Sequence, residues 1–225
     1  MRNNVFRSAQ KAGVKFFLSL FCLVTPAFCQ LVSVGVKAGV PLTDAFSSMQ
    51  SSFTYGTRRY VVGGTAELHL PFRFSVELDA LYRRIGFDYR FQSLDIGHFL
   101  SRTTANQWDF PLLVKYEVLR GPIRPFVDAG PVLRHLSGIT ETSSFATFFP
   151  FQTGSTVSNS SLYLRNRNSP GFAIGGGVTA KLFRLRLSPE IRYIRWSNEA
   201  FQGENGGGTI NSNLNQLDLM VGFAF

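Results

Sequence analysis

The chain has 225 residues, of which 44% are hydrophobic and only 16% are charged, and it carries a formal net charge of +9. The length allows one or two domains, and the composition excludes both a disordered chain and a long coiled coil. Nucleic-acid binding would suit the positive charge, but the start of the chain predicts export, which removes that class of partner.

The first 29 residues have the pattern of a secretory signal peptide. Four basic residues precede an apolar run over residues 16–24, and small residues precede a predicted cleavage site after Cys29. The run is shorter than the roughly 20 residues that a membrane-spanning helix needs. Cleavage takes the formal charge from +9 to +5 and removes both cysteines, so we predict a mature domain, residues 30–225, without cofactor or cysteine-bound metal. A lipid-modified Cys29 is the alternative, which the bulky Phe28 disfavours.

Eight later segments alternate apolar and polar residues with a period of two, as β-strands with one apolar face do. In chain order they cover residues 32–40, 60–70, 74–82, 108–118, 125–133, 172–182, 183–193 and 217–225. None of the apolar faces carries a charged residue. A lipid-facing surface excludes charge in this way, because a basic side chain near the bilayer midplane costs about 2–4 kcal/mol.

The connections between these segments alternate between short and long. The long ones, which we expect to be solvated loops, cover residues 41–59, 92–107, 136–169 and 197–213. Short turns on one side and long loops on the other are typical of barrels in the outer membrane of a Gram-negative envelope. We therefore predict an all-β fold, an eight-stranded antiparallel up-and-down transmembrane β-barrel with both mature termini in the periplasm. A soluble lipocalin-like carrier is the alternative, and it would carry its charges on the outside.

Local features add further expectations. Pro111, Pro131 and Pro189 each lack a ladder donor, so we expect β-bulges there. The alternation changes phase at Arg83 and Arg84, which predicts another bulge and a strand that projects beyond the membrane. Aromatic residues expected at the two membrane interfaces are Tyr60, Tyr82, Trp108, Tyr193 and Trp196 at the long-loop ends and Phe72, Phe74, Tyr116, Phe223 and Phe225 at the short-turn ends.

The final strand ends on an aromatic residue. Its apolar face consists of Leu217, Leu219, Val221, Phe223 and Phe225. We predict that this face is the signal by which the barrel-assembly machinery of the outer membrane engages the chain.

Four segments resemble a known family. Residues 34–40, 108–116, 124–131 and 189–193 are similar to the PorT-like outer-membrane β-barrel domain family, and the likeness spans nearly all of the mature chain. The resemblance implies an outer-membrane barrel and says little about activity. PorT proteins proper are linked to a protein-secretion system, and no residue here is diagnostic of that role.

The polar faces of the strands carry eight acids and eight bases. Eleven of them form the lumen charge network that we predict: Lys37, Glu67, Glu77, Asp79, Lys115, Glu117, Asp128, Arg186, Glu190, Arg192 and Asp218. The other five are Arg83, Asp109, Arg134, Lys181 and Arg184. Because side chains fill the interior of an eight-stranded barrel, we predict a lumen plugged by paired charges. A narrow channel is the alternative.

Catalytic and metal chemistry have weak support in the sequence. His135 and Ser137 resemble the His-x-Ser pair of lipid A deacylase barrels, but the nearest acid, Glu141, lies in a predicted loop. His69, His98 and His135 lie on different segments, so we predict no metal site. We therefore expect a structural or surface-interaction protein and keep acyl hydrolysis at His135 and Ser137 as the alternative.

Six arginines fall near the outward ends of the second to fourth strands. They are Arg58, Arg59, Arg83, Arg84, Arg90 and Arg102. Because guanidinium groups pair well with phosphate, we hypothesise that this rim binds lipopolysaccharide phosphates. The long loops remain available to an extracellular or periplasmic protein partner that the sequence does not name.

Overall fold

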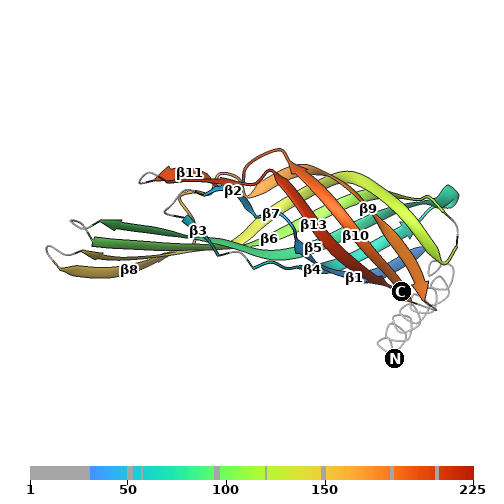
Figure 1. Ribbon diagram of the computed structural model, residues 1–225, viewed down its shortest axis with the longest axis horizontal. Coiled ribbons are helices and arrows are strands. Elements are labelled where there is room, and N and C mark those ends of the chain that lie inside the picture. Colours follow the sequence, from blue (N-terminus) through green and yellow to red (C-terminus); the bar gives the residue numbers. More distant parts are fainter. Residues whose placement is uncertain are drawn as a thin grey trace, which may run out of the picture.

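Eight long strands close into one antiparallel barrel in the computed structural model of the protein (Figure 1). The structure describes residues 31–49, 53–56, 58–93, 97–119, 121–147, 151–182, 185–205 and 208–225, so the predicted signal peptide lies outside the described residues. The barrel strands are β1 (Val32–Pro41), β4 (Val61–His69), β5 (Phe74–Ser93), β6 (Gly97–Glu117), β7 (Ile123–Thr147), β9 (Asn168–Leu182), β10 (Leu185–Trp196) and β13 (Asn215–Ala224). Each pairs with the next barrel strand in the chain, and β1 pairs with β13 to close the ring. The predicted eight-stranded up-and-down barrel is confirmed.

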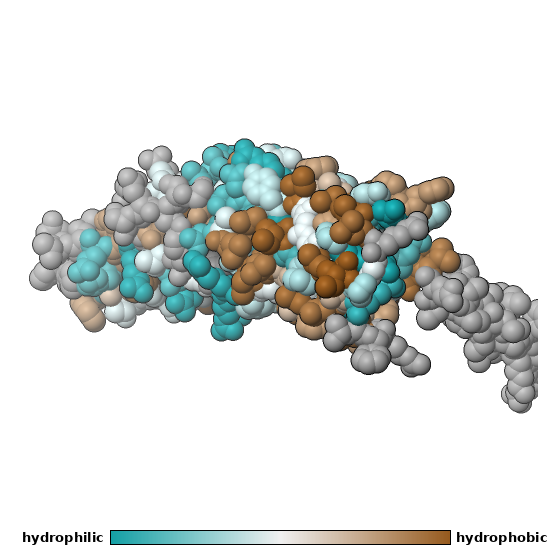
Figure 2. All heavy atoms as spheres, turned by 45° about the vertical axis from the view of Figure 1, so that its right-hand side comes forward, coloured by the Kyte–Doolittle hydropathy of each residue, from teal (hydrophilic) through white to brown (hydrophobic). Residues whose placement is uncertain are grey.

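The outer wall of the barrel is apolar and its interior is charged. Val34, Leu133 and Phe172 are 57–61% exposed on the outside, whereas Arg192 and Asp218 are fully buried inside. Figure 2 shows apolar side chains gathered over the barrel wall. A soluble carrier has the opposite arrangement, so the lipocalin-like alternative is wrong.

No helix among the residues that the structure describes is both long and apolar enough to cross a membrane. A short 3-10 helix, η1 (Pro71–Arg73), forms the tight turn between β4 and β5.

Strands β5, β6 and β7 continue far beyond the barrel. They have 20, 21 and 25 residues, about twice the 9–11 that a tilted membrane strand needs. Short strands complete this region: β2 (Phe46–Met49), β3 (Phe53–Tyr55), β8 (Gln152–Ser158), β11 (Gln202–Asn205) and β12 (Gly208–Ser212). The expectation of solvated loops at residues 92–107 and 136–169 is therefore wrong, since most of the described part of both is β-structure.

The far ends of β5 (from Ile85), β6 (to Ala105) and β7 (from Leu136), together with the five short strands, form what we call the cap. β3 pairs with β5 and β8 with β7, while β11, β12 and β2 form a separate three-stranded sheet. Both groups project from the same end of the barrel, opposite the C-terminus (Figure 1). The cap has its own core, which contains Phe46, Phe53, Ile85, Phe87, Tyr89, Ala105, Leu136, Ile139, Tyr163, Ala200, Phe201 and Ile210.

The predicted bulge at Arg83 and Arg84 is wrong, because the pairing of β5 with β6 runs through both residues without a shift. The inner face of β5 instead changes character. Its odd-numbered residues include the charged Glu77, Asp79 and Arg83, and beyond them Ile85 and Phe87 enter the core of the cap. The apparent change of phase therefore marks the border between barrel and cap.

The bulges predicted at Pro111, Pro131 and Pro189 are also wrong, since the register is the same on both sides of each proline. In an antiparallel pair of strands, hydrogen-bonded residue pairs alternate with pairs that form no hydrogen bond. A proline can therefore lose its one N–H bond without shifting the pairing of the strands. The register shift between β6 and β7 lies instead at the border of the cap, where Gly138 and Ile139 oppose Ala105. Gly138 has a φ of 55°, the left-handed conformation that bulge glycines adopt.

Candidate functional site

The middle of the lumen is filled by six charged side chains that we call the plug. They are Lys37, Glu77, Asp79, Lys115, Glu190 and Arg192, and all six are buried. Three cations thus face three carboxylates. The alternation of the strands places them there, because each lies on the inward face of β1, β5, β6 or β10.

Two cations hold the plug together. Lys37 Nζ donates to Glu77, to Asp79 at 3.2 Å and to Glu190 at 3.0 Å. Arg192 donates to the same three carboxylates, at 2.6 Å to Glu190, 2.8 Å to Asp79 and 3.0 Å to Glu77. Such shared, charge-assisted bonds compensate for the removal of the charges from water.

A second group of charges lies nearer the cap. This mouth cluster consists of Arg83, Asp109, Arg134 and Asp218, with Gln107 and Gln216. Arg83 makes a bidentate pair with Asp218 at 2.7 and 3.1 Å. Arg134 donates to Gln216 at 2.8 Å and lies 3.7 Å from the ring centroid of Trp196. Gln216 in turn donates to Asp218 at 2.7 Å.

Apolar side chains separate the two charged groups. Leu81 on β5 and Leu113 on β6 stand between the plug and the mouth cluster along their strands, and Ile194 on β10 stands between Arg192 and Trp196. All three are at most 1% exposed. The lumen therefore contains a charged layer, apolar residues and a second charged layer in succession.

The other charged residues of the predicted network lie outside the plug and the mouth cluster. Glu117 pairs with Arg124 at 2.8 Å near the short-turn end, where Arg186 contacts His69. Glu67 accepts a hydrogen bond from Ser75 at 2.5 Å and lies 3.6 Å from Lys115 at the edge of the plug. Both carboxylate oxygens of Asp128 are buried and lack a hydrogen-bond partner within the described part of the chain. Lys181 lines the same short-turn end, and Arg184 lies outside the described residues.

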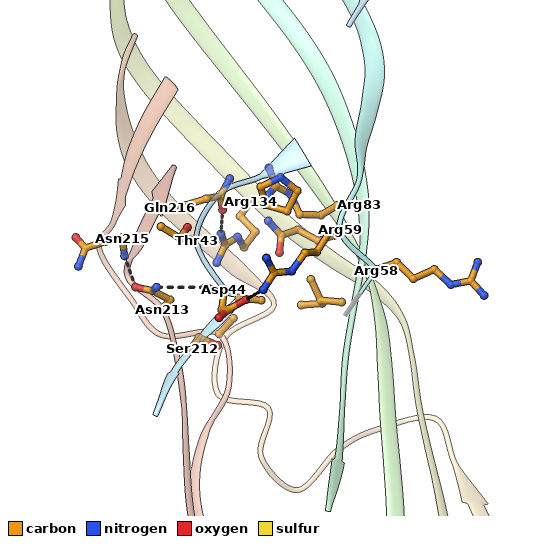
Figure 3. Close-up of a pocket in the computed structure, with 15 residues that line it drawn as sticks. Thr43, Asp44, Arg58, Arg59, Arg83, Arg134, Ser212, Asn213, Asn215 and Gln216 are labelled. Atoms are coloured by element: carbon orange, nitrogen blue, oxygen red, sulfur yellow. Dashed lines mark hydrogen bonds and ion pairs between the residues drawn. The ribbon is translucent and has the colours of Figure 1, made fainter. Parts of the chain in front are cut away.

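The six rim arginines do not form one surface. Arg83 belongs to the mouth cluster and is only 5% exposed, so its assignment to a lipid-binding rim is wrong. Arg59 turns toward Asp44, with which it pairs at 2.6 Å (Figure 3). Arg90 is exposed farther out on β5.

The remaining three, Arg58, Arg84 and Arg102, line a groove of about 280 Å³ on the outer wall of the cap, next to Gly56. We call it the outer groove. Arg102 makes two hydrogen bonds to Asp88 there, at 2.8 and 2.9 Å. These bonds hold the pKa of the Asp88 carboxyl below its usual value.

A pocket lies where the barrel meets the cap, and we call it the mouth pocket (Figure 3). Arg59, Arg83 and Arg134 line it, together with Asp44 and several neutral polar residues. These side chains come from segments far apart in the sequence: the connections that flank β1 and β4, and strands β5, β7 and β13. Arg58, also at the pocket, points away from it (Figure 3).

Trp196 is a residue whose position the sequence analysis misjudged. It was expected at the membrane interface, but it is 1% exposed inside the barrel, where it donates to Gln216 at 3.2 Å and stacks against Arg134. The alternation could have placed it correctly. Tyr193 faces outward, so an even-numbered residue of β10 faces inward.

The possible catalytic group is not assembled. His135 projects outward, and its Nδ1 lies 2.7 Å from the amide oxygen of Asn168. Glu141 is buried on the inner face of the cap, where Ser101 donates to it at 2.9 Å. The bulge at Gly138 lies between His135 and Glu141, and the two side chains face opposite sides of β7.

Several solved structures are similar to this chain, and the first named here supports the fold. OprG from Pseudomonas aeruginosa is similar with a TM-score of 0.54 and 17% identity, over 86% of this chain and 93% of that one. Neisserial surface protein A is 12% identical with a TM-score of 0.43, over 86% of this chain and 95% of that one. Ail, the attachment invasion locus protein of Yersinia pestis, is 11% identical with a TM-score of 0.37, over 87% and 97%.

Comparison with curated proteins finds no match. A family model described as the outer membrane protein β-barrel domain, however, matches residues 9–195. With the closed barrel and its apolar outer wall, this match establishes that the chain belongs to the outer membrane β-barrel domain family.

Proposed function

We propose that the protein, after removal of residues 1–29, is a non-conducting barrel that displays the cap at the cell surface, in a structural or surface-interaction role. The observation that supports this proposal is the succession of plug, apolar residues and mouth cluster along the lumen, because side chains fill the interior of an eight-stranded barrel. The cap is then extracellular and both mature termini are periplasmic. A β-structured cap with its own core is a large, ordered surface for contact with other molecules.

Conductance in planar bilayers tests the closed lumen. The reconstituted protein is expected to give no unitary conductance under conditions in which a general porin conducts. Steady single-channel steps that depend on this protein would overturn the proposal and favour the narrow channel.

Labelling in intact cells tests the orientation. Both natural cysteines precede residue 30, so introduced cysteines are the only thiols of the mature chain. Val157→Cys, on an exposed position of β8, is expected to react with a membrane-impermeant maleimide. Phe72→Cys, exposed at the short turn, is expected to react only after the outer membrane is permeabilised. The reverse result would invert the orientation.

We propose as a second function that the outer groove binds lipopolysaccharide phosphates. Arg84 follows the outward-facing Tyr82 by two residues, which puts the groove just beyond the aromatic residues at the membrane interface. Changing Arg58, Arg84 and Arg102 together to Gln is expected to lower the lipopolysaccharide that co-purifies with the barrel. Arg167→Gln, an exposed arginine outside the groove, is the control. Equal amounts of lipid in both variants would contradict the proposal.

We infer that the protein is not an enzyme, because His135 faces an amide and Glu141 is turned away from it. Lipid A acylation is expected to be unchanged when the protein is expressed. Loss of acyl chains with the natural sequence but not with Ser137→Ala would establish the deacylase alternative.

We also propose that β13 carries the assembly signal and that the family assignment can be narrowed to the PorT-like group. Leu219, Phe223 and Phe225 are exposed along the outer side of this strand, where assembly machinery can reach them. Replacing Phe223 and Phe225 with Ser is expected to reduce the amount of folded barrel in the outer membrane.

The PorT-like assignment rests on the four segments that resemble that family.

A further inference from the structure

We propose that the mouth pocket is a binding site for a small oxyanion, a carboxylate or a phosphate, taken from the outside of the cell. This site is distinct from the outer groove, which lies on the outer wall of the cap. The inference rests on the proposed orientation, which places the pocket at the extracellular mouth of the barrel.

Two buried arginines, Arg83 and Arg134, line the floor of the pocket. Arg83 and Arg134 have side chains that are 6% and 7% exposed. The Nε–H group of each is buried and has no hydrogen-bond partner within the described part of the chain. Arg134 Nε lies 3.5 Å from Asp109, an ion-pair distance without hydrogen-bond geometry. Because Arg83 and Arg134 both line the pocket, their guanidinium groups place positive charge beside any ligand in it.

The charges around the pocket favour an anion. Arg59, Arg83 and Arg134 line it, whereas Asp44 is its one lining carboxylate within the described residues. Asp109 and Asp218, which compensate for the two floor arginines, do not line the pocket. A ligand in the pocket therefore meets more cationic than anionic side chains.

Asp44 acts as an internal competitor for the ligand. Its carboxylate pairs with Arg59 at the rim, and both side chains are accessible, with 44% and 66% exposure. An exposed pair of this kind is weak, so an incoming oxyanion can take the place of Asp44 on Arg59. Neutral polar groups complete the rim, including Thr43, Ser212 and Asn213.

The size of the pocket restricts the ligand. Its volume is about 80 Å³. On the same scale, a cavity needs about 10–15 Å³ to hold one water molecule. This space holds several waters or one small oxyanion, and it excludes an oligosaccharide or a peptide from the floor.

The test uses the mature barrel refolded in detergent without lipopolysaccharide, titrated by calorimetry with inorganic phosphate and, separately, with acetate. Chloride at equal ionic strength is the reference. Saturable binding of either probe is expected, and the probe that binds tells whether the natural ligand is a phosphate or a carboxylate. Absence of saturable binding for both probes would overturn the proposal, and it would leave the outer groove unaffected because no lipopolysaccharide is present.

Two rim variants give opposite expected effects without disturbing the lumen. Arg59→Gln removes one charged donor and is expected to weaken binding roughly tenfold. Asp44→Asn removes the competitor and is expected to strengthen binding roughly threefold. Arg167→Gln, an arginine that does not line the pocket, is expected to leave the affinity unchanged. Heat-dependent gel mobility establishes that each variant is folded. If Arg59→Gln and Arg167→Gln bind alike, or if Asp44→Asn weakens binding, the pocket is not the site.

Discussion

Arg192 on β10 donates a 2.8 Å hydrogen bond to Asp79 on β5, and these two strands stand diametrically opposite in the ring. Four steps separate them in either direction around the eight strands. The bond therefore joins opposite walls of the lumen. Lys37 on β1 joins the same carboxylate at 3.2 Å, so the link across the lumen does not depend on one contact.

Removing Arg192 should destabilise the whole barrel. Arg192→Gln leaves Glu77, Asp79 and Glu190 with too few cations in a buried site, and breaking such a buried pair costs about 3–5 kcal/mol. Urea unfolding in lipid vesicles, followed by gel mobility without heating, measures the loss. Arg195→Gln is the control on the same strand, because Arg195 faces outward and bonds only Asn215 among the described contacts. Equal stabilities for the two variants would show that the plug contributes nothing.

The alternation of residues predicted the barrel because every lipid-facing position obeys one rule, the exclusion of charge. The same rule placed the plug residues inside, since Lys37, Asp79 and Arg192 all lie on polar faces. It could not predict which charges meet across the lumen. Those contacts depend on the stagger of strands that are not neighbours, such as β5 and β10, and the sequence contains no local signal for it.

The cap was missed for a different reason. Ile85 and Phe87 continue the inward face of β5. Because they are apolar, whereas the inward residues of the barrel are mostly charged, the sequence alone suggests a shift in phase at this point. Their partner Phe46 lies on the short strand β2 and Phe201 lies just before β11, in segments that look like loops. Such non-local packing is not visible in a pattern of period two.

The core of the cap should unfold independently of the barrel. Phe87 is 1% exposed, and its ring contacts those of Phe46, Phe53, Tyr163 and Phe201. Phe87→Ala is expected to cost the cap about 3–5 kcal/mol, because it leaves a cavity among these rings. Limited proteolysis of the cap should accelerate while the barrel keeps its heat-dependent gel mobility. Loss of folded barrel in the same variant would show that cap and barrel form one cooperative unit.

The bulge at Gly138 should be a point where a methyl group is not tolerated. The glycine has a φ of 55°, and a Cβ there would lie 2.6 Å from Nδ2 of Asn106. Gly138→Ala is expected to lose about 1–2 kcal/mol from the left-handed backbone conformation alone. Gly64→Ala is the matched control, since a Cβ at that position meets nothing closer than 4.0 Å. The same urea unfolding assay compares them, and a harmless Gly138→Ala would mean that the bulge can relax.

The pair of Asp88 and Arg102 should make the outer groove sensitive to acid. The hydrogen bond from Arg102 lowers the pKa of Asp88 in the folded cap relative to the unfolded chain. A carboxylate with a lowered pKa stabilises the fold above its unfolded pKa of about 3.9, and the stabilisation is lost as the pH falls through the lower folded value. Carbon-13 NMR of the Asp88 carboxyl should therefore show a midpoint below the ordinary value in the natural protein and a higher midpoint in Arg102→Gln. Arg90→Gln, a change at the neighbouring exposed arginine on β5, is expected to move the midpoint less, because Arg90 acts on Asp88 through its charge whereas Arg102 also donates hydrogen bonds. Should both variants shift the Asp88 midpoint equally, long-range charge and not the hydrogen bond would set the titration.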